Sequence, residues 1–241
     1  MIRKTVSTLL QWRVRDLLPL VLTIRIVGLG LAALALWAFL QIADKVLQEQ
    51  SHAIDKAILL ALFKLHTPLL NQVMLGLTFL GEPTVLFVIS LLGGIWLLIQ
   101  SRRSEATILA IAAAGAALLN YLLKELFARA RPVLWERIVD VGHYSFPSGH
   151  AMLSLVVYGI IAYLLLNHFP RWQLLIISLT WLLITGIGLS RLYLGVHWPT
   201  DVAAGYAAGS VWLIACIFSL EIHRYYRSLQ GTKKDNSLLA Q

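Results

Sequence analysis

Six separate stretches of this 241-residue chain are long and apolar enough to cross a lipid bilayer as helices. A membrane-spanning helix needs about 20 apolar residues, and the bilayer interior holds no water to satisfy unpaired backbone groups. The sequence therefore predicts an all-α fold, a polytopic membrane protein with six transmembrane helices. The six stretches are Ile26–Ala43, Pro83–Gln100, Ala106–Leu123, Ala151–Asn167, Trp172–Leu189 and Val202–Leu220.

The low content of charged residues agrees with a chain that lies in a lipid bilayer. Only 13% of the residues are charged and 59% are hydrophobic, whereas soluble domains carry about 25% charged residues. The formal net charge of +8 does not indicate a nucleic-acid partner, because the basic residues flank the apolar stretches and form no soluble face. The single cysteine, Cys216, lies inside the last apolar stretch and is expected to be a core residue.

The segment between the first two apolar stretches, residues 44–80, has a different pattern. From Ile54 to Leu65, apolar residues recur at helical spacing, with charged residues at other positions of the helical wheel. We expect a short interfacial helix there, which lies on the membrane surface and ends at Pro68. The residues that follow, up to Gly81, are expected to re-enter or skirt the bilayer.

An even number of spans places both chain ends on one side of the membrane. That side carries more Lys and Arg residues than the opposite side, which favours cytoplasmic termini. The expected divisions are a basic cytoplasmic segment over 1–25, a membrane domain over 26–222 and a basic, partly disordered cytoplasmic tail over 223–241. In an inner (plasma) membrane, the ends of spans three and five and the starts of spans four and six would then face the periplasm or the exterior.

Three polar patches fall on this outward side. They are KELFARARP at the end of span three (Lys124–Pro132), SFPSGH at the start of span four (Ser145–His150) and SRLYLGVHWPTD between spans five and six (Ser190–Asp201). Each patch alone has a structural explanation, such as basic side chains that reach the headgroups or a serine and a proline that begin a helix. Together they bring cations, two histidines and a carboxylate to one face, which favours a functional site.

The cations of these patches suit a phosphate ligand. Lys124, Arg131 and Arg191 would supply positive charge to phosphoryl oxygens, and an arginine can bind two oxygens at once. Lys124 and Arg131 would share a helix face if the third span continued that far. Ser148 and Gly149 lie where a helix begins, and the free backbone N–H groups at a helix start attract anions.

The two histidines suit a two-step covalent reaction. Asp201 follows Pro199 in the first turn of the expected sixth span, from which its carboxylate could fold back and orient His197. His150, beside the anion site, would be left as a proton donor. A metal site formed by His150, His197 and Asp201 is the competing interpretation, but the neighbouring cations would repel a divalent ion. We therefore expect no metal and no other cofactor.

The three patches together resemble the signature of a known family. K-x6-RP (Lys124, Arg131, Pro132), PSGH (Pro147–His150) and SR-x5-H-x3-D (Ser190, Arg191, His197, Asp201) are similar, in order and spacing, to the motifs of the type 2 phosphatidic acid phosphatase superfamily. The resemblance implies that His197 is the nucleophile and forms a phosphohistidine, and that Asp201 orients it. It also implies that His150 protonates the leaving group and then activates the water that hydrolyses the phosphohistidine. It also implies that Lys124, Arg131, Ser148, Gly149 and Arg191 hold the phosphate and that no metal takes part.

The expected function is that of an integral membrane lipid phosphatase that acts at the extracytoplasmic face. Undecaprenyl diphosphate, phosphatidylglycerol phosphate and phosphatidic acid all fit as substrates, because each presents a phosphate at the membrane surface. Two alternatives stay open. One is a phosphotransferase that passes phosphate from a polyprenyl diphosphate to another acceptor, and the other is a non-catalytic lipid transporter on the same fold.

Several further polar and small residues have both a structural and a functional explanation. Glu82 and His143 could line the entrance of the site, although a structural role is the more common one for such residues. Asn120 precedes Lys124 by one helical turn and could support it or bond to a neighbouring helix. Gly205 and Gly209 form a GxxxG pattern, which indicates close helix packing within the monomer or dimerisation.

Overall fold

The computed structural model describes residues 26–136, 138–139 and 141–238, and their side chains as far as residue 227. All the regular elements in these ranges are helices, which confirms the predicted all-α fold. The helices are Ile26–Leu47, α2 (His52–Phe63), α3 (Pro68–Leu80), α4 (Pro83–Ile99), α5 (Arg103–Phe127), α6 (Gly149–His168), α7 (Gln173–Tyr193) and α8 (Pro199–Leu238), with a short 3-10 helix at Pro170–Trp172.

Five of these helical segments have the length and hydropathy of membrane spans. They are Ile26–Leu47, α5, α6, the segment Pro170–Tyr193 that contains α7, and α8 as far as Arg227. α3 and α4 together are also long and apolar enough, although they meet at an angle of 49°. The chain is therefore a multi-pass membrane protein with five spans, or six if the bent pair counts as one.

The structure differs from the prediction at the end of the surface helix and at the end of the last helix. Pro68 does not end the surface helix, because α2 already ends at Phe63 and Pro68 begins α3. A proline suits the first turn of a helix, where its missing N–H is not needed, and the Thr67 hydroxyl caps α3 by accepting a hydrogen bond from Leu70 N at 3.2 Å. α8 continues to Leu238, into the segment predicted to be a partly disordered tail.

The length of α8 agrees with the absence of proline after Pro199, the first residue of this helix. A proline inside the helix would interrupt its backbone hydrogen bonds. Residues 1–25 lie outside the described residues. The division of the chain into segments over 1–25, 26–222 and 223–241 therefore stays a prediction.

The break between α3 and α4 is fixed by contacts with α6 and α7. A Cβ atom on Gly81 would lie 2.4 Å from Ile187 Cγ2 of α7, so only glycine fits at this point. The Tyr158 hydroxyl of α6 donates a hydrogen bond of 2.7 Å to Leu80 O, a carbonyl that the end of α3 leaves unpaired. Pro83 then begins α4. The break places Glu82 beside the start of α6.

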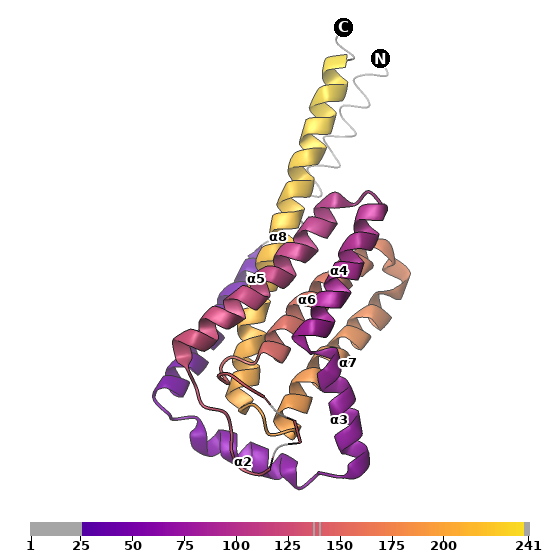
Figure 1. Cartoon of the computed structure of the whole chain (residues 1–241). Coiled ribbons are helices and arrows are strands. Elements are labelled where there is room, and N and C mark those ends of the chain that lie inside the picture. Colours follow the sequence, from indigo (N-terminus) through magenta and orange to yellow (C-terminus); the bar gives the residue numbers. More distant parts are fainter. Residues whose placement is uncertain (1–25, 137, 140, 239–241) are drawn as a thin grey trace.

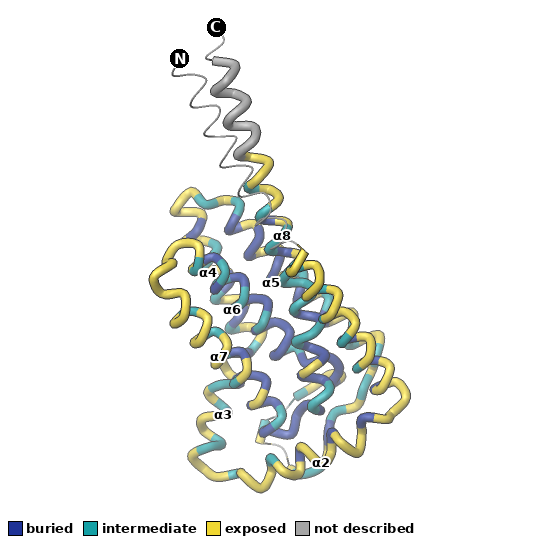
Figure 2. Tube along the Cα trace, turned by 180° about the vertical axis from the view of Figure 1, so that it is seen from behind, coloured by how far each residue is buried: buried dark blue, intermediate teal, exposed yellow. Residues whose placement is uncertain are grey.

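α6 forms the centre of the bundle, because it packs against α4, α5, α7 and α8. Figure 2 shows buried residues concentrated along this central helix, while the surrounding helices turn exposed residues outward. Many of these exposed residues are large and apolar; Leu174 of α7, for example, is 83% exposed. Apolar side chains on the outer surface are the expected arrangement for helices that contact lipid.

The contact between α6 and α8 depends on the GxxxG pattern of α8. A Cβ atom on Gly205 would lie 2.7 Å from Ser148 O, and one on Gly209 would lie 3.1 Å from Met152 O. The two glycines therefore let the backbones of α6 and α8 approach each other. This is close helix packing within the monomer, the first of the two explanations given for the GxxxG pattern. This close approach also brings the start of α8 against the start of α6.

The predicted functional patches meet at one end of the bundle. The carboxyl ends of α5 and α7 and the amino ends of α6 and α8 lie there, and α2 runs across this end, which is the lower end in Figure 1. The orientation of α2 is the one expected of a helix on the membrane surface. The first helix closes one side, since Phe39 contacts Phe127 and Phe146 with ring centroids 6.3 and 6.0 Å apart.

Candidate active site

The starts of α6 and α8 are joined by a hydrogen bond between their backbones. Ser148 precedes the first residue of α6, and its N–H donates to Asp201 O at 2.9 Å. Asp201 lies in the first turn of α8, as predicted. Gly149 faces Asn120 of α5, whose Oδ1 would lie 2.9 Å from a Cβ atom at this position. Glycine therefore lets α5 approach the start of α6.

His197 and Asp201 form a buried pair. His197 Nδ1 lies 3.3 Å from Asp201 Oδ2, and the same carboxylate oxygen accepts a hydrogen bond of 2.9 Å from Trp198 N. Neither residue is more than 1% exposed. Burial, and next the nearby positive charges of Arg131 and Arg191, hold the pKa of His197 well below its ordinary range. A neutral imidazole whose Nδ1–H faces the carboxylate has a free lone pair on Nε2.

Arg131 lies on the Nε2 side of His197. Its Nη1 atom is 3.1 Å from His197 Nε2 and donates a hydrogen bond of 2.8 Å to Val196 O. Its Nε and Nη2 atoms donate to the carbonyl oxygens of Gly142 and His143 at 2.9 to 3.2 Å. Backbone oxygens therefore hold the guanidinium beside Nε2 of His197.

Lys124 and Arg131 do not share one helix face, because the condition for it, that the third span continues as far as Arg131, is not met. α5 ends at Phe127, and Ala128 follows in the left-handed conformation with φ of 44°. Arg131 is therefore a loop residue that turns back toward His197. Lys124 remains on the last turn of α5, where its Nζ atom donates a hydrogen bond of 2.7 Å to Tyr144 O.

Two buried polar atoms of the site have no hydrogen-bond partner in the described part of the chain. They are Ser148 Oγ, at the start of α6, and Arg191 Nε, near the end of α7. Ser148 is completely buried and Arg191 is 3% exposed. Arg191 is oriented by Thr78 of α3, whose hydroxyl accepts a hydrogen bond from Arg191 Nη1. An unsatisfied buried donor costs about 1–3 kcal/mol, which an anionic ligand with several oxygens would offset.

His150 is paired with a residue that the sequence did not assign to the chemistry. His150 Nε2 lies 3.2 Å from Glu82 Oε2, and the Glu82 side chain is 47% exposed at the break between α3 and α4. Of the two explanations for Glu82, the geometry favours the one at the entrance of the site. His143 instead lies 3.7 Å from Glu125, with its side chain 69% exposed.

The competing metal interpretation has no matching arrangement among the described residues. The structure brings no three His, Cys, Asp or Glu side chains of these residues into a group that could hold an ion. His150 pairs with Glu82, whereas His197 and Asp201 pair with each other. That the reaction needs no metal stays a prediction.

Arg129 and Asp55 form a second buried layer behind the His197–Asp201 pair. Arg129 Nη1 donates to Asp201 Oδ1 at 2.7 Å, and Arg129 Nη2 donates to Asp55 Oδ2 at 2.9 Å. Asp55, on α2, also accepts hydrogen bonds of 3.1 Å from Thr200 N and 2.6 Å from Thr200 Oγ1. The interfacial helix is therefore tied through one arginine to the carboxylate that contacts His197.

Comparison with known proteins identifies the family of this chain. A model of the PAP2 superfamily matches residues 105–224, which contain all three motifs. Phosphatidylglycerophosphatase B of Bacillus subtilis is 32% identical over 174 residues, which cover 71% of this chain and 85% of that protein. This chain belongs to the PAP2 superfamily. The resemblance of its motifs to the type 2 phosphatidic acid phosphatases is thereby confirmed.

Further relatives of this PAP2 chain agree with the fold and with the class of substrate. The crystal structure of a transmembrane PAP2-type phosphatidylglycerolphosphate phosphatase from Bacillus subtilis is similar, with a TM-score of 0.73 and 30% identity, over 79% of this chain and 96% of that one. An undecaprenyl-diphosphatase of Sulfolobus acidocaldarius is 42% identical over 67 residues, or 28% of this chain and 29% of that protein. These similarities support a lipid phosphatase.

Sequence reasoning missed the layer formed by Arg129 and Asp55. Arg129 belongs to the first polar patch, whose basic side chains have a structural explanation at the headgroups, and Asp55 is one of the charged residues of the surface helix that lie apart from the apolar spacing. Asp55 is in fact 1% exposed and lies one helical turn before Leu59, which is completely buried. This four-residue spacing on α2 was the only signal that Asp55 faces the protein.

Arg129→Ala in this PAP2 protein is expected to lower the free energy of unfolding by about 3–5 kcal/mol. The substitution leaves the buried carboxylates of Asp55 and Asp201 without the cation that they share. Thermal unfolding of the purified protein in detergent measures the effect. Arg171→Ala, which removes an exposed arginine on the opposite end of the bundle, is the control and should leave the melting temperature unchanged. Equal melting temperatures for both variants would contradict the role given to the ion pairs.

Proposed function

We propose that this protein removes phosphate from the headgroup of a membrane lipid, a phosphomonoester or a diphosphate, through a phosphohistidine at His197. One observation carries the proposal. Neutral His197, held by Asp201, turns Nε2 toward Arg131, while Ser148 Oγ and Arg191 Nε remain unsatisfied. A phosphoryl group bound among these atoms would give each of them an oxygen and would present phosphorus to Nε2.

In the first step, His197 Nε2 attacks phosphorus and the bond from phosphorus to the oxygen of the lipid product breaks. His150 gives a proton to that oxygen as it leaves. The carboxylate of Asp201 offsets the positive charge that develops on the imidazole, at the Nδ1 contact of 3.3 Å. Arg131, now 3.1 Å from Nε2, would turn its donor to a phosphoryl oxygen.

In the second step, a water molecule attacks phosphorus and the bond from nitrogen to phosphorus breaks. His150 takes the proton of this water, which returns both histidines to their starting states and releases inorganic phosphate. The carboxylate of Glu82, 3.2 Å from His150 Nε2, would stabilise the protonated imidazole before the first step and after the second. Lys124, Arg131, Ser148, Gly149 and Arg191 would hold the phosphoryl oxygens throughout.

The first test is phosphate release by the purified protein with EDTA present. Undecaprenyl diphosphate, phosphatidylglycerol phosphate and phosphatidic acid are compared, and we expect release from at least one to survive the chelator, because His197 replaces a metal-bound nucleophile. Loss of activity in EDTA and its return with a divalent ion would contradict the metal-independent reaction. Release only after an acceptor lipid is added would favour a phosphotransferase.

We further propose that the site faces the periplasm or the exterior of an inner (plasma) membrane, with both termini in the cytoplasm. The distribution of Lys and Arg supports this orientation. In a Cys216→Ala background, Val133→Cys in the loop after α5 should react with an impermeant thiol reagent added to intact cells, since Val133 is 82% exposed. Arg171→Cys, at the opposite end of the bundle, should react only after permeabilisation. The reverse pattern would contradict the orientation.

A further inference from the structure

Glu82 gives the entrance of the site a negative charge beside His150. Its Oε2 atom lies 3.2 Å from His150 Nε2, and its side chain is 47% exposed. The backbone of the α3–α4 break packs on the same imidazole ring, since a Cβ atom on Gly81 would lie 3.2 Å from His150 Cδ2. His150 is the one ion-pair partner of Glu82 in the part of the chain that the structure describes. The negative charge of Glu82 is therefore fixed near the imidazole.

The cations of the site are engaged by other groups. Arg191 is 3% exposed, donates to the Thr78 hydroxyl and has its unsatisfied Nε atom assigned to the transferred phosphoryl group. It interacts electrostatically with Glu82 without forming an ion pair with it. Arg131 and Lys124 donate to backbone oxygens of the loops that follow α5 and α7. None of the three is paired with Glu82.

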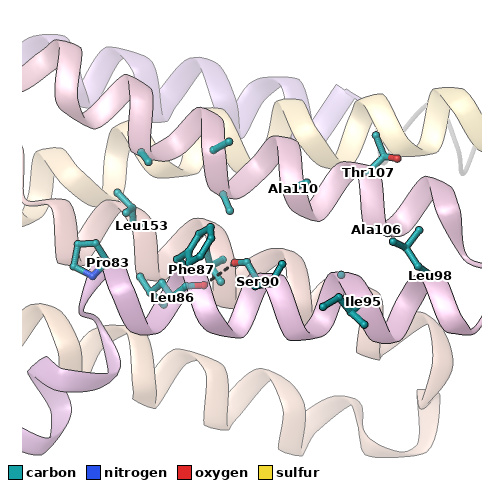
Figure 3. A pocket seen from close by; sticks show the side chains of 16 residues that line it. Pro83, Leu86, Phe87, Ser90, Ile95, Leu98, Ala106, Thr107, Ala110 and Leu153 are labelled. Carbon is teal, nitrogen blue, oxygen red and sulfur yellow. Dashed lines mark hydrogen bonds between the residues drawn. The ribbon is translucent and has the colours of Figure 1, made fainter.

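The surface that continues from Glu82 along α4 is apolar. Pro83 directly follows Glu82 and lines one end of a groove between α4 and α5 (Figure 3). None of the described residues that line this groove is charged, and its two hydroxyl groups, of Ser90 and Thr107, donate to carbonyl oxygens of their own helices. A second anionic group at the entrance would therefore meet a carboxylate and an apolar surface.

The leaving group of the proposed reaction lies on the Glu82 side of phosphorus. The attacking atom and the leaving oxygen lie roughly in line on opposite sides of phosphorus, so the leaving oxygen points away from His197. His150 must reach that oxygen to give it a proton, and Glu82 contacts the same imidazole. Whatever group the leaving oxygen carries is therefore close to the carboxylate of Glu82.

Phosphomonoesters and diphosphates place different groups at this point. A phosphomonoester releases an alcohol, which takes its proton from His150 and carries no charge. A diphosphate is attacked at its terminal phosphorus, the bond from this phosphorus to the bridging oxygen breaks, and the group that leaves is a negatively charged lipid phosphate. Two negative charges a few ångströms apart repel each other more strongly in a partly buried site than in water. The leaving group of a diphosphate is therefore repelled by Glu82, whereas an alcohol is not.

We propose that Glu82 determines the substrate class, because it selects lipid phosphomonoesters over lipid diphosphates. The inference rests on the proposed phosphatase function, since it gives a second task to the residue that supports His150. The same carboxylate assists the release of an alcohol, by stabilising the protonated imidazole, and opposes the release of an anion. A diphosphate gains little from the protonated imidazole in return, because a phosphate leaves without a proton.

Glu82→Gln tests the inference, because it removes the charge and keeps the size of the side chain. The substrates are phosphatidic acid and the diacylglycerol diphosphate with the same acyl chains, which differ only in the leaving group. Initial rates of phosphate release are measured with EDTA present, so that no divalent ion screens the charges. Glu125→Gln is the matched control, since the Glu125 side chain is 43% exposed on the last turn of α5 and lies 3.7 Å from another histidine, His143.

Glu82→Gln is expected to raise kcat/KM for the diphosphate by about tenfold and to lower it for phosphatidic acid. Glu125→Gln should change neither value, and Glu82→Asp, which keeps the charge, should not raise the value for the diphosphate. The unsubstituted protein should prefer phosphatidic acid.

If Glu82→Gln leaves kcat/KM for the diphosphate unchanged or lowers it, the inference is overturned, since Glu82 would then act only through His150. A preference of the unsubstituted protein for the diphosphate would also overturn it, while leaving the phosphatase function intact. No release from either lipid, nor from phosphatidylglycerol phosphate, would instead refute the proposed function.

Discussion

His197→Ala is expected to reduce the turnover of lipid phosphate by about four orders of magnitude or more. The substitution removes Nε2 of His197, the atom proposed to bond with phosphorus, while the other histidine of the site, His150, keeps its contact with Glu82. Phosphate release from the best of the lipid substrates measures the effect. The loss should be the same at every substrate concentration, because the residues proposed to bind the phosphate remain.

The control for this variant is His223→Ala, which removes an exposed histidine of α8 and should retain full activity. Both variants should melt at a temperature close to that of the unsubstituted protein. His197 is buried but its pKa is lowered, so replacing the neutral ring leaves no buried charge without a partner. If folded His197→Ala keeps more than a small fraction of the activity, the assignment of the nucleophile is wrong.

His150→Ala is expected to reduce turnover by about two to four orders of magnitude, the range for a positioned acid or base. The size of the loss should depend on the leaving group. The alkoxide of a lipid phosphomonoester leaves only with a proton, whereas the phenolate of an aryl phosphate leaves readily without one. The rate of the first step in His150→Ala should therefore fall much less with an aryl phosphate, which releases a phenol in that step, than with a lipid phosphomonoester.

The comparison of the two histidine variants separates their roles. His197→Ala should be equally inactive in the first step with aryl and lipid phosphates, because the missing bond to phosphorus does not depend on the leaving group. His150→Ala should show a rapid release of the phenol followed by slow turnover, since the second step still lacks its base. An equal loss for His150→Ala with both kinds of substrate would contradict a role in leaving-group protonation.

Hydropathy and local spacing were sufficient to predict the membrane fold. Each of the six predicted stretches falls on a helix, because about 20 apolar residues in lipid have no other stable conformation. The start of α6 at Gly149 and the place of Asp201 in the first turn of α8 also followed from local signals, a serine and a proline at the expected positions. These features depend on residues that are near one another in the sequence.

The contacts that the sequence did not predict join distant segments. Arg129 and Asp55 are 74 residues apart, and Glu82 and His150 are 68 residues apart. Both depend on how α2 and the α3–α4 break lie against the bundle, which no periodicity in one segment determines. The position of Arg131 depends on the left-handed conformation of Ala128, which is uncommon for a residue with a Cβ atom.

α2 therefore has a role beyond that of a surface helix. Asp55 binds Arg129 and Thr200, and Arg129 binds Asp201, so the helix at the membrane surface helps to fix the carboxylate that contacts His197.

The most direct test of the proposed chemistry is to trap the phosphorylated protein. His150→Ala is mixed with an aryl phosphate, stopped in alkali, in which phosphohistidine is stable, and analysed by mass spectrometry of its peptides. Because the second step lacks its base, phosphate should accumulate on His197 to nearly one equivalent, and none should be found on His197→Ala. Phosphate on another residue, or release of the phenol with no phosphorylated peptide, would contradict a phosphohistidine at His197.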